Sequence, residues 1–315
     1  MKNFFSKLFR KSNEGSNPPF SAPAAKETPT LPIPSGTPGN NDSAVIAEDS
    51  LSDDLPQLVV GCAQSTGMQR NHNEDSMFTF TSNLANRGRF LAFGLYIVAD
   101  GMGGHKHGEF ASSLAVKTLA QHILAQVFSP LLQPEPKLPE ESIQEILQDG
   151  VQKAHQVISK FATGGGTTLT VSLIIDQQMT VTHIGDSRCY TITPDGTMTL
   201  ITRDHSLVMR MIELGQLTKD EAAVHPQRNV LYRALGQSEP LTADIQTHPL
   251  PAGGLILICS DGLWGVVPET KIIDIIADAN SPQQACEQLV TAANQAGGPD
   301  NITAILVRVP DKLDP

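Results

Sequence analysis

The sequence predicts an α+β protein in which antiparallel strands form layers and helices are grouped in pairs. Beyond about residue 55, apolar runs of strand length follow one another with short turns between them. The helical periodicities come two at a time and do not alternate with single strands. This order of elements favours layered antiparallel sheets over an alternating, doubly wound fold.

Residues 1–55 differ in composition from the rest of the chain. They are rich in Pro, Ser, Thr and Gly, with too little apolar surface to offset the entropy of ordering. We predict a disordered tail over residues 1–55 and a folded domain over residues 56–315. Residues 1–11 would place Phe and Leu on one helical face with Lys and Arg around it. This segment is either a helix with weak membrane-surface or partner contact or, the preferred interpretation, an unstructured start.

The folded domain begins with strands and continues with two helices. Residues 59–63, 76–80 and 90–99 are apolar runs typical of strands. Apolar side chains recur every three or four positions over residues 109–127 and again over residues 143–161, which predicts two amphipathic helices. Because a short, proline-containing loop joins these helices, we expect them to lie antiparallel.

The pattern then returns to strands. Strands are predicted over residues 168–175, 180–184, 188–193 and 198–202. The Pro-Asp-Gly sequence at residues 194–196 has the composition of a tight turn, so we expect the last two strands to form a hairpin.

Residues 203–236 interrupt the sheet with short helices. Ser206 is in position to cap one of them, and Thr218 with Glu221 forms a capping box at the start of another. The remaining elements are a strand over 255–260, helices over 271–279 and 282–296, and a closing strand over 303–309.

Composition argues against several classes of protein. The chain has 315 residues, of which 40% are hydrophobic, and a formal net charge of −11. Because phosphate neutralisation needs clustered Lys and Arg, we do not expect a nucleic-acid partner. No run approaches the ~20 apolar residues that span a bilayer, and no signal-peptide core is evident. The four scattered cysteines contain no CxxC pair, which is typical of a reducing compartment, so we expect a cytoplasmic protein.

Acidic residues stand at the ends of several strand-like runs. Asp100, Asp186 and Asp261 each end an apolar run beside a glycine, and the pair Glu74-Asp75 and Asp300 precede two further runs. If these ends converge, carboxylates ~4 Å apart repel one another by roughly 4 kcal/mol per pair at an effective dielectric of ~20. A single Asp-Gly pair is usually only a turn, but the set predicts a cation site. Oxygen-only ligands favour Mg²⁺ or Mn²⁺, and an aspartate bridging two ions would form a two-metal clamp.

Six short motifs lie within about residues 58–310, and five of them contain these acidic residues. They are Arg70-Asn71-His72-Asn73-Glu74-Asp75, Asp100-Gly101-Met102-Gly103-Gly104, Gly166-Thr167-Thr168, Gly185-Asp186-Ser187-Arg188, Ser260-Asp261-Gly262-Leu263-Trp264 and Gly298-Pro299-Asp300-Asn301-Ile302-Thr303. Their order resembles that of the metal-dependent protein phosphatases of the 2C type, the PPM family of Ser/Thr phosphatases, in its bacterial branch. The resemblance implies a four-layer α-β-β-α sandwich of two antiparallel sheets flanked by helix pairs.

The resemblance also implies a reaction and a role for each ligand. A water or hydroxide that bridges two Mn²⁺ or Mg²⁺ ions would hydrolyse phosphoserine and phosphothreonine on proteins and so reverse Ser/Thr kinases. Asp100 would bridge the two ions, and the Gly101 carbonyl would bind one of them. Asp261 and Asp300 would bind the other ion, which makes Asp100, Asp261 and Asp300 the catalytic residues.

Further residues would complete the site in the same way. The resemblance implies that Glu74 and Asp75 hold the metals partly through water and that Asp186 serves a third ion. Arg70 would bind the substrate phosphate, because a guanidinium group matches two phosphate oxygens. Residues 203–236 would correspond to the flap, a segment beside the site that touches the substrate protein.

The histidines differ from the eukaryotic pattern of this family. Eukaryotic relatives place a histidine, proposed to protonate the leaving alkoxide, where this chain has Met102, so a metal-bound water or another acid must do so here. His105 and His107 are near in sequence but their direction is open. His183 is predicted to be a hydrogen-bonded core or supporting residue, and His205 to cap or pack the flap.

Three functions fit these motifs. The leading hypothesis is a monomeric Mg²⁺- or Mn²⁺-dependent phosphatase whose partners are phosphorylated proteins, including Ser/Thr kinases and their substrates. The second is an inert family member that serves as a binding module, although such relatives lose metal ligands and this chain keeps them. The third is a two-metal phosphoesterase for small molecules, which the flap sequence does not exclude.

Overall fold

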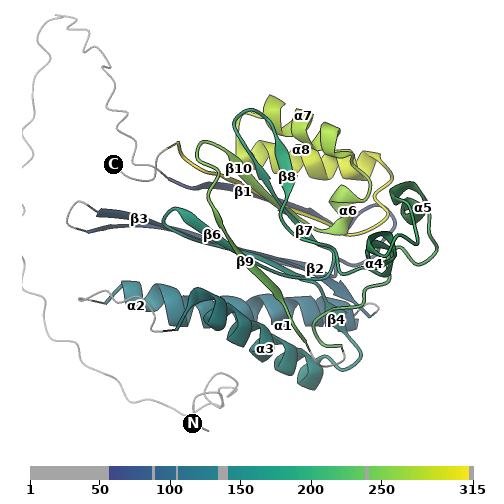
Figure 1. The fold of residues 1–315 in the computed structure, drawn as a ribbon, viewed down its shortest axis with the longest axis horizontal. Coiled ribbons are helices and arrows are strands. Elements are labelled where there is room, and N and C mark those ends of the chain that lie inside the picture. Colours follow the sequence, from purple (N-terminus) through teal and green to yellow (C-terminus); the bar gives the residue numbers. More distant parts are fainter. Residues whose placement is uncertain (1–56, 87–88, 104–105, 134–140, 238–240, 312–315) are drawn as a thin grey trace, which may run out of the picture. The chain divides into compact units, whose positions relative to one another are not determined.

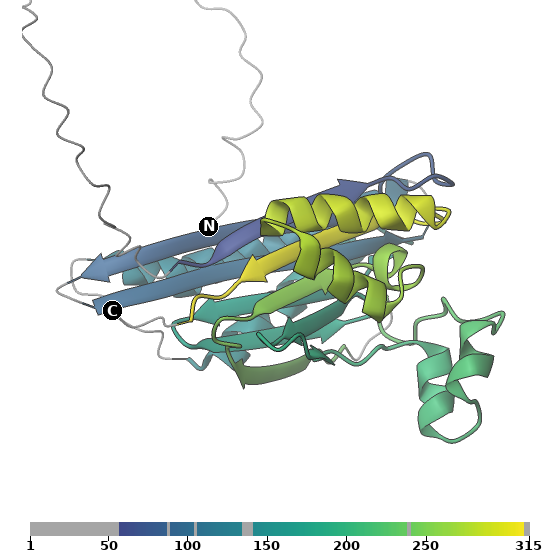
Figure 2. The ribbon, with the colours of Figure 1, turned by 90° about the horizontal axis from the view of Figure 1, so that it is seen from above.

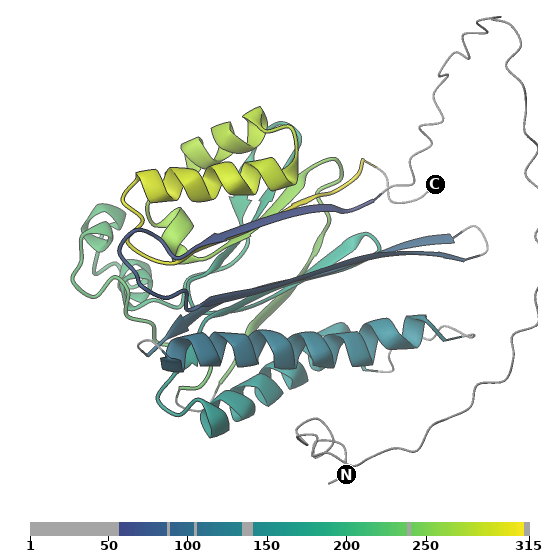
Figure 3. The same cartoon turned by 180° about the vertical axis from the view of Figure 1, so that it is seen from behind.

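Two antiparallel sheets face each other in the unit Ser52–Pro315. The computed structural model describes residues 57–86, 89–103, 106–133, 141–237 and 241–311. The predicted tail of residues 1–55 therefore lies outside the described residues. Helices cover the outer face of each sheet, which gives the four layers expected from the sequence (Figures 1 and 3).

The first sheet has five strands in the order β1-β11-β10-β7-β8. All four strand pairs are antiparallel. The strands are β1 (Val59–Ser65), β11 (Ile302–Arg308), β10 (Leu255–Cys259), β7 (Arg188–Ile192) and β8 (Met198–Leu200). The turn predicted at residues 194–196 joins β7 and β8 as a hairpin.

The second sheet has six strands, with five in the order β2-β3-β5-β6-β9 and β4 paired to β3. They are β2 (Asp75–Asn86), β3 (Arg89–Met102), β4 (Gly166–Thr167), β5 (Leu169–Ile175), β6 (Gln178–Ile184) and β9 (Asp244–Pro249). Sequence analysis missed β9, an edge strand whose residues are mostly polar and partly exposed. It forms by pairing with β6, and the sequence of β9 has no apolar pattern from which this tertiary contact could be predicted.

Each helix pair buries one apolar face on a sheet. Helices α1 (Lys106–Ile123) and α3 (Ile143–Phe161) pack on the second sheet, and α7 (Glu269–Asp278) and α8 (Pro282–Gln295) on the first. A third core, with Tyr96, Val181 and Ile258 among its members, fills the space between the sheets. None of the described helices is both long enough and apolar enough to cross a bilayer.

The first predicted helix ends differently from expectation. Beyond α1 the chain continues as one π-helical turn, Leu124–Phe128, and the short helix α2 (Ser129–Leu131). Val127 is nevertheless buried against the same core, so the predicted apolar face extends through this change of helix type.

The flap stands apart from the sandwich as two short helices (Figures 1 and 2). Ser206 caps α4 (Leu207–Glu213), because its side chain accepts the N–H of Met209. Thr218 and Glu221 form the predicted capping box of α5 (Lys219–Ala223). The sequence therefore located both helix starts correctly.

Candidate active site

The acidic residues lie at one end of the two facing sheets. In the second sheet, β2 begins at Asp75, directly opposite Asp100 near the end of β3. In the first sheet, the end of β10 pairs with the start of β11, so Asp261 and Asp300 flank neighbouring strands. Because adjacent strands are antiparallel, the last residues of one strand and the first residues of the next lie at the same end of the sheet. Carboxylates that are distant in sequence therefore meet there.

A cleft of about 220 Å³ opens at this edge. It is lined by every residue predicted for the site except Asp75, which is buried and lies beside Asp100 on the neighbouring strand. The described lining residues are Arg70, Glu74, Asp100, Gly101, Met102, Gly103, Thr168, Asp186, Asn229, Leu231, Asp261, Asp300 and Asn301.

Burial and mutual repulsion raise the pKa values of the cleft carboxyl groups. The pKa of Asp261 rises to about 6, first because the group is buried and then because Asp300 is negatively charged. Burial, followed by the charges of Asp75 and Asp261, raises the pKa of Asp100 well above its usual value. The pKa of Asp186 shifts in the same direction, through burial and then Asp261 and Asp204.

Asp75 is held rigidly behind the cleft. Its Oδ2 accepts hydrogen bonds from Ser260 Oγ at 2.8 Å and Thr303 Oγ1 at 2.6 Å. Burial raises its pKa to about 7 despite these two bonds, which act in the opposite direction. The two hydroxyl groups therefore orient the carboxylate without making its charge favourable.

The donor set fits hard divalent cations. Asp75 Oδ1 and Asp261 Oδ1 are buried and accept no hydrogen bond from the described part of the chain. A buried carboxylate oxygen without a donor is costly, and a cation satisfies it. No three His, Cys, Asp or Glu side chains among the described residues already surround one point. The candidate donor atoms are all oxygens, the ligands that Mg²⁺ and Mn²⁺ prefer.

Arg70 lies at the cleft as predicted. Its Nη2 is 2.7 Å from Asp300 Oδ2, and the arginine side chain is 49% exposed. A guanidinium group carries five N–H donors, so this pair leaves most of them available to a ligand in the cleft.

Gly101 allows the backbone to pack closely beside Asp100. A Cβ atom at this position would lie 2.3 Å from the Gly108 carbonyl oxygen in α1 and 2.6 Å from that of Glu74. The Gly101 N–H also donates to the Glu74 carbonyl at 3.2 Å. No larger residue fits between the start of α1 and the loop before β2.

Asn301 is a supporting residue that sequence reasoning missed. Its side chain is buried, Oδ1 accepts the Glu74 N–H at 2.8 Å, and Nδ2 donates to the carbonyl oxygens of Thr66 and His72 at 2.9 and 2.8 Å. These bonds join the loop that carries Arg70 and Glu74 to the loop that carries Asp300. In the sequence, the sign of this role is that Asn301, an amide residue, directly follows the predicted ligand Asp300.

We expect Asn301→Ala to lower stability by roughly 2–4 kcal/mol, because it leaves buried backbone groups without partners. Turnover should fall by about 10²-fold, because displacement of the loop separates Arg70 and Glu74 from the other ligands. Thermal unfolding and kcat/KM would measure the two effects. The control is Gln283→Ala, which removes an amide bridge between α8 and Cys62 far from the cleft. Equal turnover in both variants would contradict a positioning role for Asn301.

Threonines of the Gly-Thr-Thr motif hold Asp100 in place. The Asp100 N–H donates to Thr168 Oγ1 at 2.9 Å, and the Thr167 hydroxyl donates to the Asp100 carbonyl at 2.9 Å. Thr168 Oγ1 also bonds to Ser187 Oγ, next to Asp186. The motif is therefore a rigid support between two acidic strand ends.

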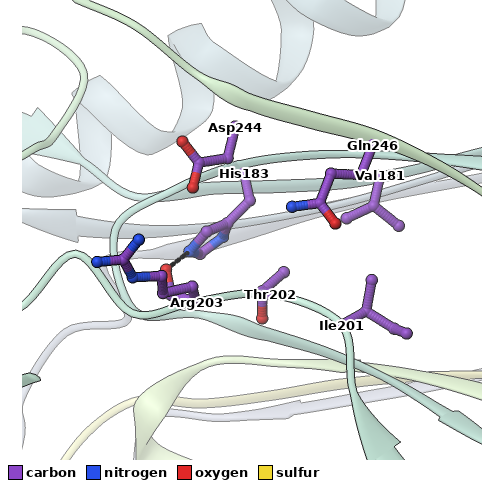
Figure 4. A pocket seen from close by; sticks show the side chains of 7 residues that line it. All are labelled: Val181, His183, Ile201, Thr202, Arg203, Asp244 and Gln246. Atoms are coloured by element: carbon purple, nitrogen blue, oxygen red, sulfur yellow. Dashed lines mark hydrogen bonds between the residues drawn. The ribbon is translucent and has the colours of Figure 1, made fainter. Parts of the chain in front are cut away.

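The histidines have structural positions. His183 is buried, and its Nε2 lies 3.1 Å from the Arg203 carbonyl oxygen (Figure 4). Its Nδ1 lies 2.9 Å from Thr170 Oγ1, and the two contacts confirm the predicted supporting role. His205 packs the flap as predicted: its ring lies 5.6 Å from that of Tyr232. His107 is exposed, and His105 lies outside the described residues.

A cleft lined by carboxylates, with an arginine beside them, indicates a class of enzyme. Paired hard cations in such a site would activate water, and the arginine matches a phosphoryl group. The fold and the site together therefore define a metal-dependent phosphoester hydrolase.

Comparisons with known proteins identify the family. The protein phosphatase 2C model matches residues 71–298. The chain is 36% identical over 247 residues to the serine/threonine phosphatase stp of Listeria welshimeri, covering 76% of this chain and 92% of the relative. It is 37% identical over 259 residues to the protein phosphatase PhpP of Streptococcus pneumoniae, covering 79% of this chain and 97% of the relative. The chain belongs to the protein phosphatase 2C family.

Solved structures agree with this assignment. The Mycobacterium tuberculosis serine/threonine phosphatase PstP/Ppp matches with a TM-score of 0.67 and 31% identity, over 81% of this chain and 99% of that chain. A structure of the PstP catalytic domain in complex with two manganese ions matches with a TM-score of 0.65 and 30% identity, over 81% and 99% of the chains. The present chain is a protein serine/threonine phosphatase of the bacterial kind, and Mn²⁺ or Mg²⁺ is its cofactor.

Proposed function

We propose that this chain removes phosphate from phosphoserine and phosphothreonine on proteins, with Asp100, Asp261, Asp300 and the Gly101 carbonyl as its principal metal ligands. The observation that carries this proposal is the carboxylate cleft. In it Asp261 Oδ1 is buried without a hydrogen-bond donor from the described residues, and burial, followed by like charge, raises the pKa values of Asp100 and Asp261. Bound Mn²⁺ or Mg²⁺ ions supply Lewis-acid activation of water and neutralise charge on the phosphoryl oxygens.

The remaining cleft residues support binding and orientation. Asp75 pairs with Asp100 across β2 and β3, and Glu74 precedes it. Glu74 and Asp75 would help to hold the metals, and Asp186, two residues after β6, would serve a third ion. Arg70 would bind the substrate phosphoryl group, because its guanidinium has N–H donors beyond the one that bonds to Asp300 and can place two of them on phosphate oxygens.

The leaving alkoxide must be protonated without a histidine at position 102. Met102 lines the cleft, and its Sδ accepts a weak hydrogen bond from Gln237 Nε2 at 3.5 Å. None of the described lining residues is a histidine. The proton therefore comes from water or another acid in the loaded site.

The cellular setting is also a proposal. Substrates are phosphorylated proteins, which would include Ser/Thr kinases and the proteins they modify, and the enzyme would act as a cytoplasmic monomer. Cys189, Cys259 and Cys286 are buried free thiols, which suits a reducing compartment. Membrane-surface contact through residues 1–11 is the alternative to an unstructured start, and a vesicle-binding assay of the full chain distinguishes the two.

The decisive experiment measures phosphate release from a phosphothreonine peptide with Mn²⁺, with Mg²⁺ and with EDTA. We expect turnover with either metal and none with chelator. A parallel assay with p-nitrophenyl phosphate separates a protein phosphatase from a small-molecule phosphoesterase, because only the former gains kcat/KM from peptide contacts with the flap. Absence of turnover from folded, metal-loaded protein would support the binding-module alternative.

A further inference from the structure

A second pocket lies at the base of the flap, outside the carboxylate cleft. It encloses about 360 Å³, more than the cleft itself, and shares Arg203 and Asp244 with the small cavity drawn in Figure 4. The described lining residues are Arg203, His205, Arg210, Tyr232, Arg233 and Asp244. Nothing in the proposed hydrolysis uses these side chains.

The pocket carries an excess of positive charge. Arg203 and Arg210 both donate to the same oxygen of Glu213, and Arg233 donates to Asp244 Oδ1 at 3.1 Å. Three guanidinium groups therefore share two carboxylates. His205 adds no charge, because burial lowers its pKa. In a chain with a net charge of −11, a local excess of arginine is not explained by composition.

The arginines are open to solvent and retain free donors. The side chains of Arg203, Arg210 and Arg233 are 52%, 53% and 38% exposed. Each guanidinium has five N–H groups in a planar fork that matches the oxygens of a phosphoryl or carboxylate group. Ion pairs that only held the flap together would not require a third arginine or an open cavity.

One short segment separates this pocket from the cleft. Asn229 and Leu231 line the cleft, whereas the next two residues, Tyr232 and Arg233, line the second pocket. The segment is held by the Tyr232 N–H, which donates to the His205 carbonyl at 2.9 Å, and by a bridge between Leu231 and Ser206. Because consecutive Cα atoms are about 3.8 Å apart, one substrate chain crossing this wall can reach both sites.

We propose that the flap-base pocket binds a second anionic group of the phosphoprotein substrate, near the residue being dephosphorylated. The group is a phosphoryl or a carboxylate, which share the oxygen geometry that guanidinium recognises. Tyr232, 43% exposed at the wall, offers an aromatic surface to the intervening peptide. This inference rests on the proposed phosphatase function and adds a substrate preference to it.

The test uses the full chain with Mn²⁺ and a series of phosphothreonine peptides of equal length. In one set glutamate replaces each flanking residue in turn, in a second set phosphothreonine does so, and in a third set the substituent is glutamine. We expect kcat/KM to rise about tenfold when the added anion reaches the pocket, as charge-assisted hydrogen bonds form. The glutamate and phosphothreonine sets show which anion is preferred.

Arg210→Gln should reduce the ratio of kcat/KM for the best anionic peptide to that for its glutamine counterpart to about one, since the two remaining guanidinium groups are balanced by the two carboxylates. Arg210→Glu should reverse the ratio and favour lysine at the same peptide position. Arg308→Gln, an exposed arginine at the end of β11, is the matched control and should preserve the wild-type ratio.

The outcomes separate the two hypotheses. Equal kcat/KM for all peptides, or an anion preference that persists in both Arg210 variants, would overturn the proposed anion binding in the flap-base pocket. Either result would leave the phosphatase function intact. No phosphate release from any peptide, with Mn²⁺ and folded protein, would overturn the proposed function and the pocket with it.

Discussion

Asp261→Asn is expected to lower metal-dependent kcat/KM by about 10³-fold or more, which corresponds to about 4 kcal/mol of transition-state stabilisation. Asp261 is the first residue of the short helix α6 (Asp261–Trp264), and its Oδ1 is one of the buried oxygens that no described group satisfies. The amide keeps the shape of the side chain but removes the charge that a divalent cation needs. Asp100→Asn should have an effect of similar size.

Steady-state phosphate release and calorimetric titration with Mn²⁺ would measure the two consequences, lost turnover and weaker metal binding. Asp195→Asn is the control, because Asp195 lies exposed in the β7–β8 turn and bonds only to neighbouring residues. The metal-free Asp261→Asn protein should be at least as stable as the metal-free wild type, since one repelling charge is gone. Near-normal turnover in either cleft variant would overturn the assignment of the ligands.

The second large effect expected is a metal-dependent change in how stability varies with pH. In the metal-free folded protein the pKa of Asp75 is about 7 and that of Asp261 about 6, whereas both groups ionise near 3.8 when unfolded. Between these values the folded state binds more protons than the unfolded state. Stability of the metal-free protein therefore falls as pH rises from about 4 to about 7.

Bound metal removes this loss, because a cation favours the ionised carboxylates. We expect the Tm difference between Mn²⁺-loaded and EDTA-treated protein to widen from pH 5 to pH 8 by several degrees, the change that a few kcal/mol produces in a domain of this size. Differential scanning calorimetry would measure it. If the Tm difference between loaded and EDTA-treated protein narrows as pH rises, or if the Tm at pH 8 is the same with and without metal, these carboxylates do not hold the ion. The Asp195→Asn protein should behave as wild type.

Much of the fold was predictable because most elements carry a local signal. The apolar period of α3 and the capping pairs at Ser206 and Thr218 each depend on neighbouring residues alone. Where a local signal was weak the prediction failed. β9 has few apolar residues and exists because β6 offers it a partner. The short helix that begins at Asp261 was also not predicted, because the apolar run before it is typical of a strand and gives no sign of a following helix.

The acidic residues of the site were predicted for a different reason. A carboxylate at either end of an apolar run is visible in the sequence, and six of them suggest a cation. The groups that orient them are not visible in this way. Ser260, Thr303 and Asn301 are ordinary polar residues until the fold places a carboxylate or an unpaired backbone group within hydrogen-bond distance of each.

The sequence by itself determined the class of fold, the family motifs and which acidic residues are candidates for metal binding, because these are encoded by residue type and spacing along the chain. Only the tertiary structure decided that the acidic strand ends meet in one cleft with Arg70 paired to Asp300. The same holds for the pocket in which Arg203, Arg210 and Arg233 gather. Distances between residues far apart in sequence depend on sheet order and register, and no local pattern specifies either.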